Sequence, residues 1–141
     1  MAAASILARL AVGILVDRIG GKGALTFCLI TLVISLIALI LISAPYPLFF
    51  AMIIYGFAHG GLFTVMSPVI AEYFGLKAHG ALFGSIIFFG TISGSFARIF
   101  AGYVFDTKGS YSIAFWTLLT MALIGLFLTL ILPKSALIRT D

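Results

Sequence analysis

Three residues whose side chains could do chemistry lie inside long apolar runs of the sequence: Arg9, His59 and Arg98. A charge near the middle of a bilayer costs about 3 kcal/mol on insertion scales, so such a residue is expected to face a cavity or a partner. A guanidinium binds a carboxylate through two hydrogen bonds, and an imidazole can donate a hydrogen bond or carry a proton. We therefore predict that these three residues contact an anionic substrate.

Each of the three also has a plainer interpretation. Arg9 precedes Asp17 by eight residues, about 12 Å of helix, which places it near the bilayer midplane; its plainer interpretation is an arginine that snorkels from a shifted helix or pairs with a structural partner. Arg98 precedes Asp106 by the same number of residues, which also places it near the middle, and it could instead snorkel outward or pair with an acid on another helix. His59 could be a packing residue. Arg9 is therefore the first candidate for binding a carboxylate.

The composition indicates which elements must position these residues. Of 141 residues, 63% are apolar and only 9% are charged, and the mean hydropathy is +1.31. A soluble domain has about 25% charged residues. No charged residue occurs between Lys22 and Glu72, or between Lys108 and Lys134, and about 20 apolar residues are enough for a spanning helix. The sequence predicts an all-α, polytopic membrane protein.

Hydropathy and helix breakers predict five membrane-spanning helices in one embedded domain, 1–141. The expected spans are 2–17, 24–43, 48–74, 80–105 and 112–132, with 133–141 as a tail. Lys and Arg accumulate on the cytoplasmic side of membrane proteins, which places the loop with Arg18 and Lys22, the loop with Lys77, and the tail inside. The expected location is the plasma (inner) membrane, with a cytoplasmic C-terminus.

The expected spans differ in glycine content. The ranges 24–43 and 112–132 are rich in Leu and Ile and are predicted to face lipid. The ranges 48–74 and 80–105 carry several glycines at small-xxx-small spacings, which let helices approach closely. These two are predicted to be packed inside the bundle. Their glycines are Gly56, Gly60 and Gly61 in the first, and Gly80, Gly84, Gly90, Gly94 and Gly102 in the second.

Several functional classes are excluded by the same sequence. The basic residues are scattered singly, so no nucleic-acid footprint is present. Cys28 is the only cysteine, which leaves no disulfide framework and no cysteine metal motif. There is no GxSxG nucleophile motif and no His/Glu metal pattern. We expect no enzyme activity, no metal and no cofactor.

The most specific motif is the segment Gly13-Ile-Leu-Val-Asp17-Arg18-Ile-Gly20-Gly21-Lys22 between the first two expected spans. It resembles the GxxxDRxGxx(R/K) cytoplasmic loop of the major facilitator superfamily. The resemblance implies a charged hinge that breaks and remakes contacts as the bundle rocks, with Gly13 permitting close helix contact. Gating roles are thereby implied for Gly13, Asp17, Arg18, Gly20 and Lys22. The plainer interpretation is that interfacial charges flank a turn.

Three further segments look like the branch of monocarboxylate transporters and oxalate/formate antiporters. They are Arg9-Leu-Ala-Val-Gly13, Pro68-Val-Ile-Ala-Glu72-Tyr-Phe-Gly75 and Ala101-Gly102-Tyr-Val-Phe-Asp106-Thr-Lys-Gly109-Ser-Tyr111. The resemblance falls on the C-terminal half of that fold and lacks its first helix. It implies that Arg9 contacts the substrate carboxylate and that Glu72 pairs with Arg18.

The chain departs from this branch in two places. Phe88-Phe89-Gly90 stands where many members of the branch carry a basic residue, so Arg98 does not simply inherit that role. Ser5 stands where the monocarboxylate carriers commonly have an acid, and this leaves proton coupling through that position open.

The resemblance predicts the C-terminal part of a secondary carrier for small organic anions such as oxalate, formate or lactate, coupled to a proton or a counter-anion. Carriers of this fold place the site between two halves, so we expect a missing N-terminal half or a partner chain. Two alternatives stay open. One is a facilitator with another substrate, since fold alone does not settle cargo. The other is a truncated, non-transporting membrane protein that acts as a structural or interaction subunit.

Overall fold

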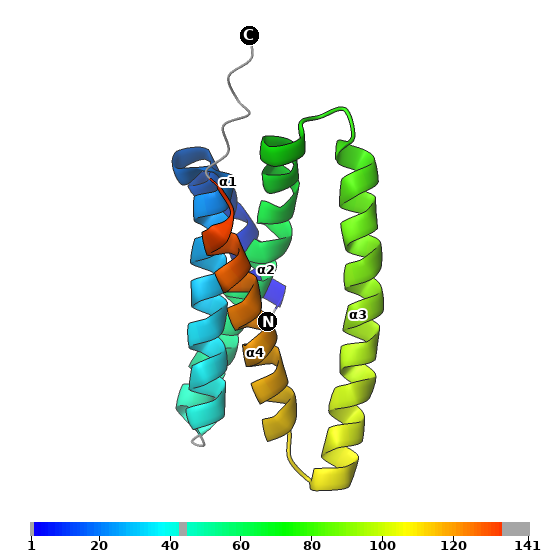
Figure 1. Cartoon of the computed structure of the whole chain (residues 1–141). Helices are drawn as coiled ribbons and strands as arrows, with labels where there is room; N and C mark the ends of the chain where they lie inside the picture. The colour runs from blue at the N-terminus through cyan, green and yellow to red at the C-terminus, as the bar shows by residue number, and fades with distance from the viewer. Residues whose placement is uncertain (1, 43–44, 134–141) are drawn as a thin grey trace.

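The computed structural model describes residues 2–42 and 45–133, which form four helices and no strand. Each helix contains a stretch long and apolar enough to cross a membrane, so the expected helical membrane class is confirmed for these residues. Figure 1 shows α1, α2 and α4 close together, with α3 beside them. The helices are α1 (Ala2–Leu41), α2 (Pro45–Phe74), α3 (His79–Lys108) and α4 (Ser112–Ile131).

Helix α1 consists of two helical arms that meet at Gly20. This residue has φ 79° and ψ 166°, outside the helical region, and glycine adopts such a φ without a steric penalty. The arms fold back on each other: a Cβ atom added to Gly61 would lie 2.9 Å from both Val12 Cγ2 and Cys28 Sγ. In a straight helix, the sixteen residues from Val12 to Cys28 would span about 24 Å. In Figure 1 the chain rises in dark blue and returns in cyan.

The described residues therefore contain four helical elements where the sequence predicted five. The expected break between 17 and 24 is a bend at one glycine, and helical residues continue on both sides of it. The expected ranges 48–74, 80–105 and 112–132 fall on α2, α3 and α4. The expected tail lies outside the described residues except for Pro133.

The core lies where the two arms of α1 pack on α2 and α4. One cluster joins both arms to α2, and a second joins the second arm to α4 with Tyr55 against it. The first is formed by Val12, Ala24, Cys28 and Val65; the second by Val33, Leu36, Leu119 and Ala122. The range 24–43, predicted to face lipid, thus contributes one face to both clusters and exposes Phe27, Ile30, Ile34 and Ile37 on the rest of its surface.

Helix α3 is almost uncovered. Val104 is its buried residue, and none of its most apolar stretch is buried. Cβ atoms added at all five of its glycines would meet nothing within 4 Å, whereas Gly56, Gly60 and Gly61 of α2 are buried. The prediction of a packed helix is confirmed for 48–74, whereas 80–105 is not packed among the described residues. Small residues permit a close neighbour, but no described helix covers this face of α3.

Candidate functional site

The bend of α1 is held by a carboxylate from the end of α2. The backbone N–H of Gly21 donates a hydrogen bond of 2.8 Å to Glu72 Oε2. The bend leaves the first N–H groups of the second arm without helical partners, and a negative charge at this end of a helix is favourable. A Cβ at Gly21 would lie 3.3 Å from the Val69 backbone and closer still to the carboxylate. Glycine at 21 therefore permits the contact.

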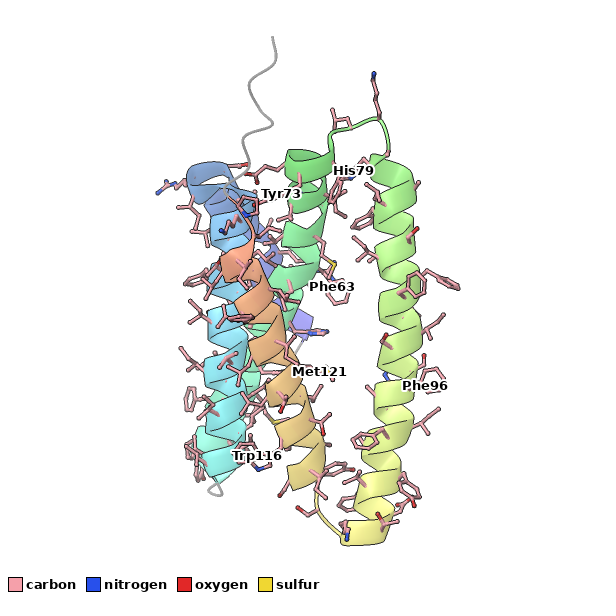
Figure 2. The ribbon with its side chains drawn as sticks, viewed as in Figure 1. Phe63, Tyr73, His79, Phe96, Trp116 and Met121 are labelled. Atoms are coloured by element: carbon pink, nitrogen blue, oxygen red, sulfur yellow. The ribbon has the colours of Figure 1, made fainter. Side chains whose placement is uncertain are left out.

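A lysine at the same bend reaches the end of α4. Lys22 Nζ donates hydrogen bonds to the backbone oxygens of Leu132 and Leu130, the latter at 3.4 Å. The last carbonyls of a helix lack partners, and a cation stabilises them. The hydroxyl of Tyr73, labelled in Figure 2, donates to the Pro133 oxygen at 2.6 Å. We call Gly20, Gly21, Lys22, Glu72 and Tyr73 the bend cluster, which ties α1, α2 and α4 together at one end.

The other residues of the loop motif are not in these contacts. Asp17 and Arg18 are exposed, and the predicted pairing of Arg18 with Glu72 stays a prediction. A Cβ added at Gly13 would meet nothing within 4 Å. The close approach expected at Gly13 is therefore absent among the described residues; helices come close at Gly21 and Gly61 instead. The motif coincides with the bend. Tyr73 lies in one of the three further segments that carry the family resemblance, but the sequence analysis gave it no role.

Arg9 and His59 lie at nearly the same depth. Val12 of the first arm packs on Gly61 of α2, and the first arm and α2 both run toward the end of the bundle that holds the bend (Figure 1). Arg9 precedes Val12 by three residues and His59 precedes Gly61 by two, about 4 Å and 3 Å of helix. The two residues therefore occupy matching levels. Arg9 is exposed, and within the described part of the chain its side chain has no hydrogen bond or ion pair.

His59 sits in a ladder of aromatic rings on α2. Its ring stacks on Tyr55 at 5.8 Å and 10°, and meets the edge of Phe63 at 5.2 Å and 80°. The three residues are spaced by four and share one helix face. The stacking matches the packing interpretation of His59, while the exposure of the side chain leaves it open to a ligand.

Arg98 is set apart from the other two. Arg9 precedes Gly20 by eleven residues and Arg98 follows His79 by nineteen, about 16 Å and 28 Å of helix respectively. The bend of α1 and the first turn of α3 lie at the same end of the bundle (Figure 1), so Arg98 is about 12 Å farther along. Thr91 and Ser95 lie on the same face of α3 as Arg98 by helical spacing, and their hydroxyls donate to carbonyls one turn earlier in the same helix. The two arginines therefore lie at different levels of the bundle, and the predicted substrate contact of Arg98 stays a prediction.

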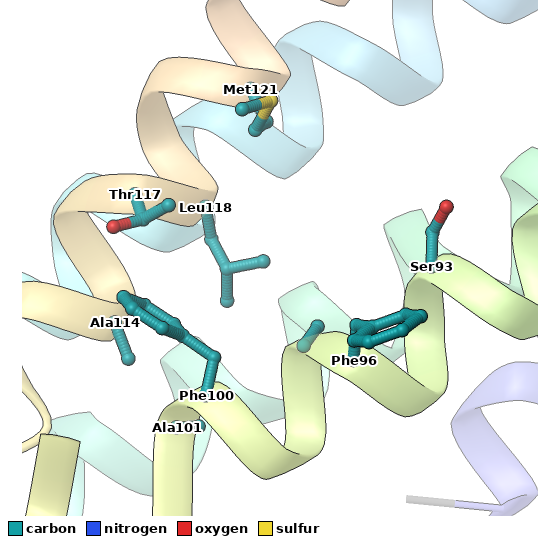
Figure 3. A pocket seen from close by; sticks show the side chains of 9 residues that line it. Ser93, Phe96, Phe100, Ala101, Ala114, Thr117, Leu118 and Met121 are labelled. Atoms are coloured by element: carbon teal, nitrogen blue, oxygen red, sulfur yellow. The ribbon is translucent and has the colours of Figure 1, made fainter. Parts of the chain in front are cut away.

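A pocket of about 460 Å³ lies between α3 and α4 (Figure 3). Its wall is mostly carbon, and the Thr117 hydroxyl donates to the Ile113 carbonyl of its own helix. Arg9, His59 and Arg98 do not line it, so it differs from the predicted anion site. It is lined by Ser93, Phe96, Ala97, Phe100, Ala101, Ala114, Thr117, Leu118 and Met121.

A comparison with known protein families identifies the family of this chain. The sequence model of the Major Facilitator Superfamily matches residues 1–139. The chain belongs to this superfamily. It is 29% identical over 140 residues to a Debaryomyces hansenii protein described as "Probable transporter MCH1". The match covers 94% of this chain but 29% of that protein, and no solved structure matches.

The match confirms the resemblance to the Major Facilitator Superfamily. Together with the four apolar helices, it identifies the chain as an integral, multi-pass membrane protein. The facilitator motif falls on the bend of α1. The chain spans less than a third of the length of the relative it matches.

Among the described residues, no group of three or more His, Cys, Asp or Glu could hold a metal ion.

Proposed function

We propose that this facilitator chain forms part of a secondary carrier that moves small organic anions, mono- or dicarboxylates, by alternating access. The observation that carries the proposal is Arg9. It is an exposed cation about 16 Å along its helix from the bend, it has no partner among the described residues, and it lies level with His59. A charge at that depth needs an anion or a water-filled cavity.

The topology follows from the bend. We propose that the two arms of α1 cross the membrane separately, which gives five crossings with α2, α3 and α4. The bend, the α2–α3 connection and the C-terminus then lie on the cytoplasmic side of a plasma membrane, where most Lys and Arg fall. The remaining helices of the carrier come from a further segment or a partner chain, since carriers of this kind place the site between two halves.

The bend cluster is the part of the structure suited to gating. It joins three helices through hydrogen bonds that involve Gly21, Lys22 and Glu72, while Asp17 and Arg18 stay exposed. A rocking motion moves helices as rigid bodies around a fixed site. We propose that Asp17 and Arg18 make their contacts with the other half of the carrier in one conformation and lose them in the other.

Uptake of labelled oxalate, formate and lactate by native membranes containing the complete assembly tests the proposal. We expect Arg9→Ala to abolish uptake with the protein level in the membrane unchanged. Arg9→Lys should lower uptake less, because it keeps the charge but loses the bidentate geometry. Arg98→Ala is the matched control and should have a small effect. Full uptake by Arg9→Ala would contradict the proposal.

A second candidate is favoured by the bare face of α3. A helix with five open glycines also suits a structural subunit that packs on other membrane helices and transports nothing. That interpretation predicts no anion uptake dependent on Arg9. A facilitator with a different substrate predicts Arg9-dependent uptake of another class of solute, so the same assay extended to labelled solutes of other classes distinguishes the three.

A further inference from the structure

A histidine at the first position of α3 fastens this helix to α2. His79 Nε2 lies 3.1 Å from Ser67 Oγ, and its ring stacks on Phe83 with centroids 6.0 Å apart and 5° between the planes. Figure 2 shows His79 at the end where α2 and α3 approach. Its second nitrogen, Nδ1, is buried and has no hydrogen-bond partner among the described residues. We call Ser67 and His79 the clasp.

The clasp suits a neutral imidazole. A neutral ring has one N–H and one acceptor nitrogen, and the serine hydroxyl can donate or accept, so the contact with Nε2 forms in either tautomer. A protonated ring has two N–H donors. One of them would be Nδ1–H, a charged donor buried without an acceptor, which is unfavourable. Protonation therefore works against the closed arrangement.

The charges around His79 do not offset this penalty. By helical spacing, the face of α2 that holds Ser67 carries Phe63, Ile70 and Phe74, none of them titratable. Glu72 points instead to Gly21 on α1.

The other neighbours are no more favourable. In the connection, Lys77 is exposed and positive. On α3 the next charged residue is Arg98, and α4 has no charged residue between Ser112 and Ile131. The N-terminal end of α3 also carries the positive end of its dipole. No described carboxylate is placed to stabilise an imidazolium.

We propose that the clasp is a proton-responsive switch: protonation of His79 separates it from Ser67 and releases the first turns of α3. The remainder of α3 is held only weakly against the other described helices, because Val104 is the buried residue of this helix. The switch itself is a property of the α2–α3 junction. Its consequence, control of the carrier by the pH on that side of the membrane, rests on the proposed function.

Distances between two spin labels can test the switch in lipid nanodiscs. The labels are placed at Ile19→Cys on α1 and Ile86→Cys on α3, both exposed positions, with Cys28 replaced by Ser. Spectra are compared at about pH 8 and about pH 5.5, the range in which histidine changes charge. We expect a narrow distance distribution at the higher pH and a longer, broader one at the lower pH.

Three variants make the test specific. His79→Gln stays neutral and can still bond Ser67, so its distribution should be narrow at both pH values. Ser67→Ala should be broad at both. Ser85→Ala is the matched control, since this hydroxyl bonds within α3, and it should behave like the parent. An unchanged pH response in His79→Gln, or no response in the parent, would overturn the proposal.

The proposal and the proposed function fail separately. Arg9→Ala should lose uptake yet keep the pH-dependent distance change. A switch without anion uptake would leave the clasp intact and remove only its role in transport.

Discussion

Helices α2 and α3 have the same length, 30 residues each, and both are rich in glycine, yet their surroundings are opposite. The three glycines of α2 are buried, Gly61 of them against both arms of α1, and those of α3 face open space. A glycine stripe shows that a helix can be approached closely, and it does not show by which helix. The partner of α2 lies in this chain, whereas the described chain supplies none for the glycine face of α3.

The largest expected effect on stability comes from a larger side chain in α2, the helix whose glycines are buried. Gly61→Leu places a side chain where even a Cβ lies 2.9 Å from Val12 and Cys28, and overpacking of this kind destabilises by about 1–3 kcal/mol or more. Gly94→Leu is the matched change in α3, where a Cβ meets nothing, and should leave the chain's stability unchanged. Thermal unfolding in detergent measures both. Equal losses would refute the contrast.

A smaller effect is expected at the bend. Glu72→Ala leaves the Gly21 N–H without its carboxylate acceptor, comparable to the loss of a helix cap, which costs about 0.5–2 kcal/mol. Asp106→Asn, near the C-terminal end of α3, serves as the control and should change the free energy of unfolding by no more than a few tenths of a kcal/mol. Denaturant unfolding checks the pair. A neutral Glu72→Ala would mean that the bend does not need the carboxylate.

The smallest effect concerns the tie between the bend and α4. Lys22→Met removes the cation from the last carbonyls of α4 and should cost about 0.3–1 kcal/mol, with faster amide exchange in the final turn of α4. Lys77→Met, at an exposed position in the α2–α3 connection, should leave that turn unaffected. If both lysines alter exchange equally, the Lys22 contact is not specific.

Charge gaps and hydropathy were enough to predict the helical class and the approximate ranges of α2, α3 and α4, because long apolar runs have few ways to satisfy their backbone in a membrane. They could not show that the first break is a one-residue bend. That depends on the backbone conformation of Gly20 and on the carboxylate of Glu72, which is distant in sequence.

The sequence predicted individual residues of the candidate site but not how they are arranged relative to one another. The sequence identified Arg9, His59 and Arg98 as unusual in apolar surroundings, and counting toward the nearest charge placed both arginines near mid-membrane. Helix packing brings Arg9 level with His59, through the contact of Val12 with Gly61, and leaves Arg98 farther along. Such contacts are long-range, so a periodic pattern within one helix does not contain them.

The most direct test of the account is protection of the Arg9 site by a carboxylate. Ile6 is exposed and lies one turn before Arg9 on the same side of the helix. The rate at which a thiol reagent modifies Ile6→Cys, in a Cys28→Ser background, is measured with and without oxalate, formate or lactate in the complete assembly. We predict slower modification with at least one of these anions, and loss of that protection in Arg9→Ala. Equal rates with and without every anion would contradict a carboxylate site at Arg9.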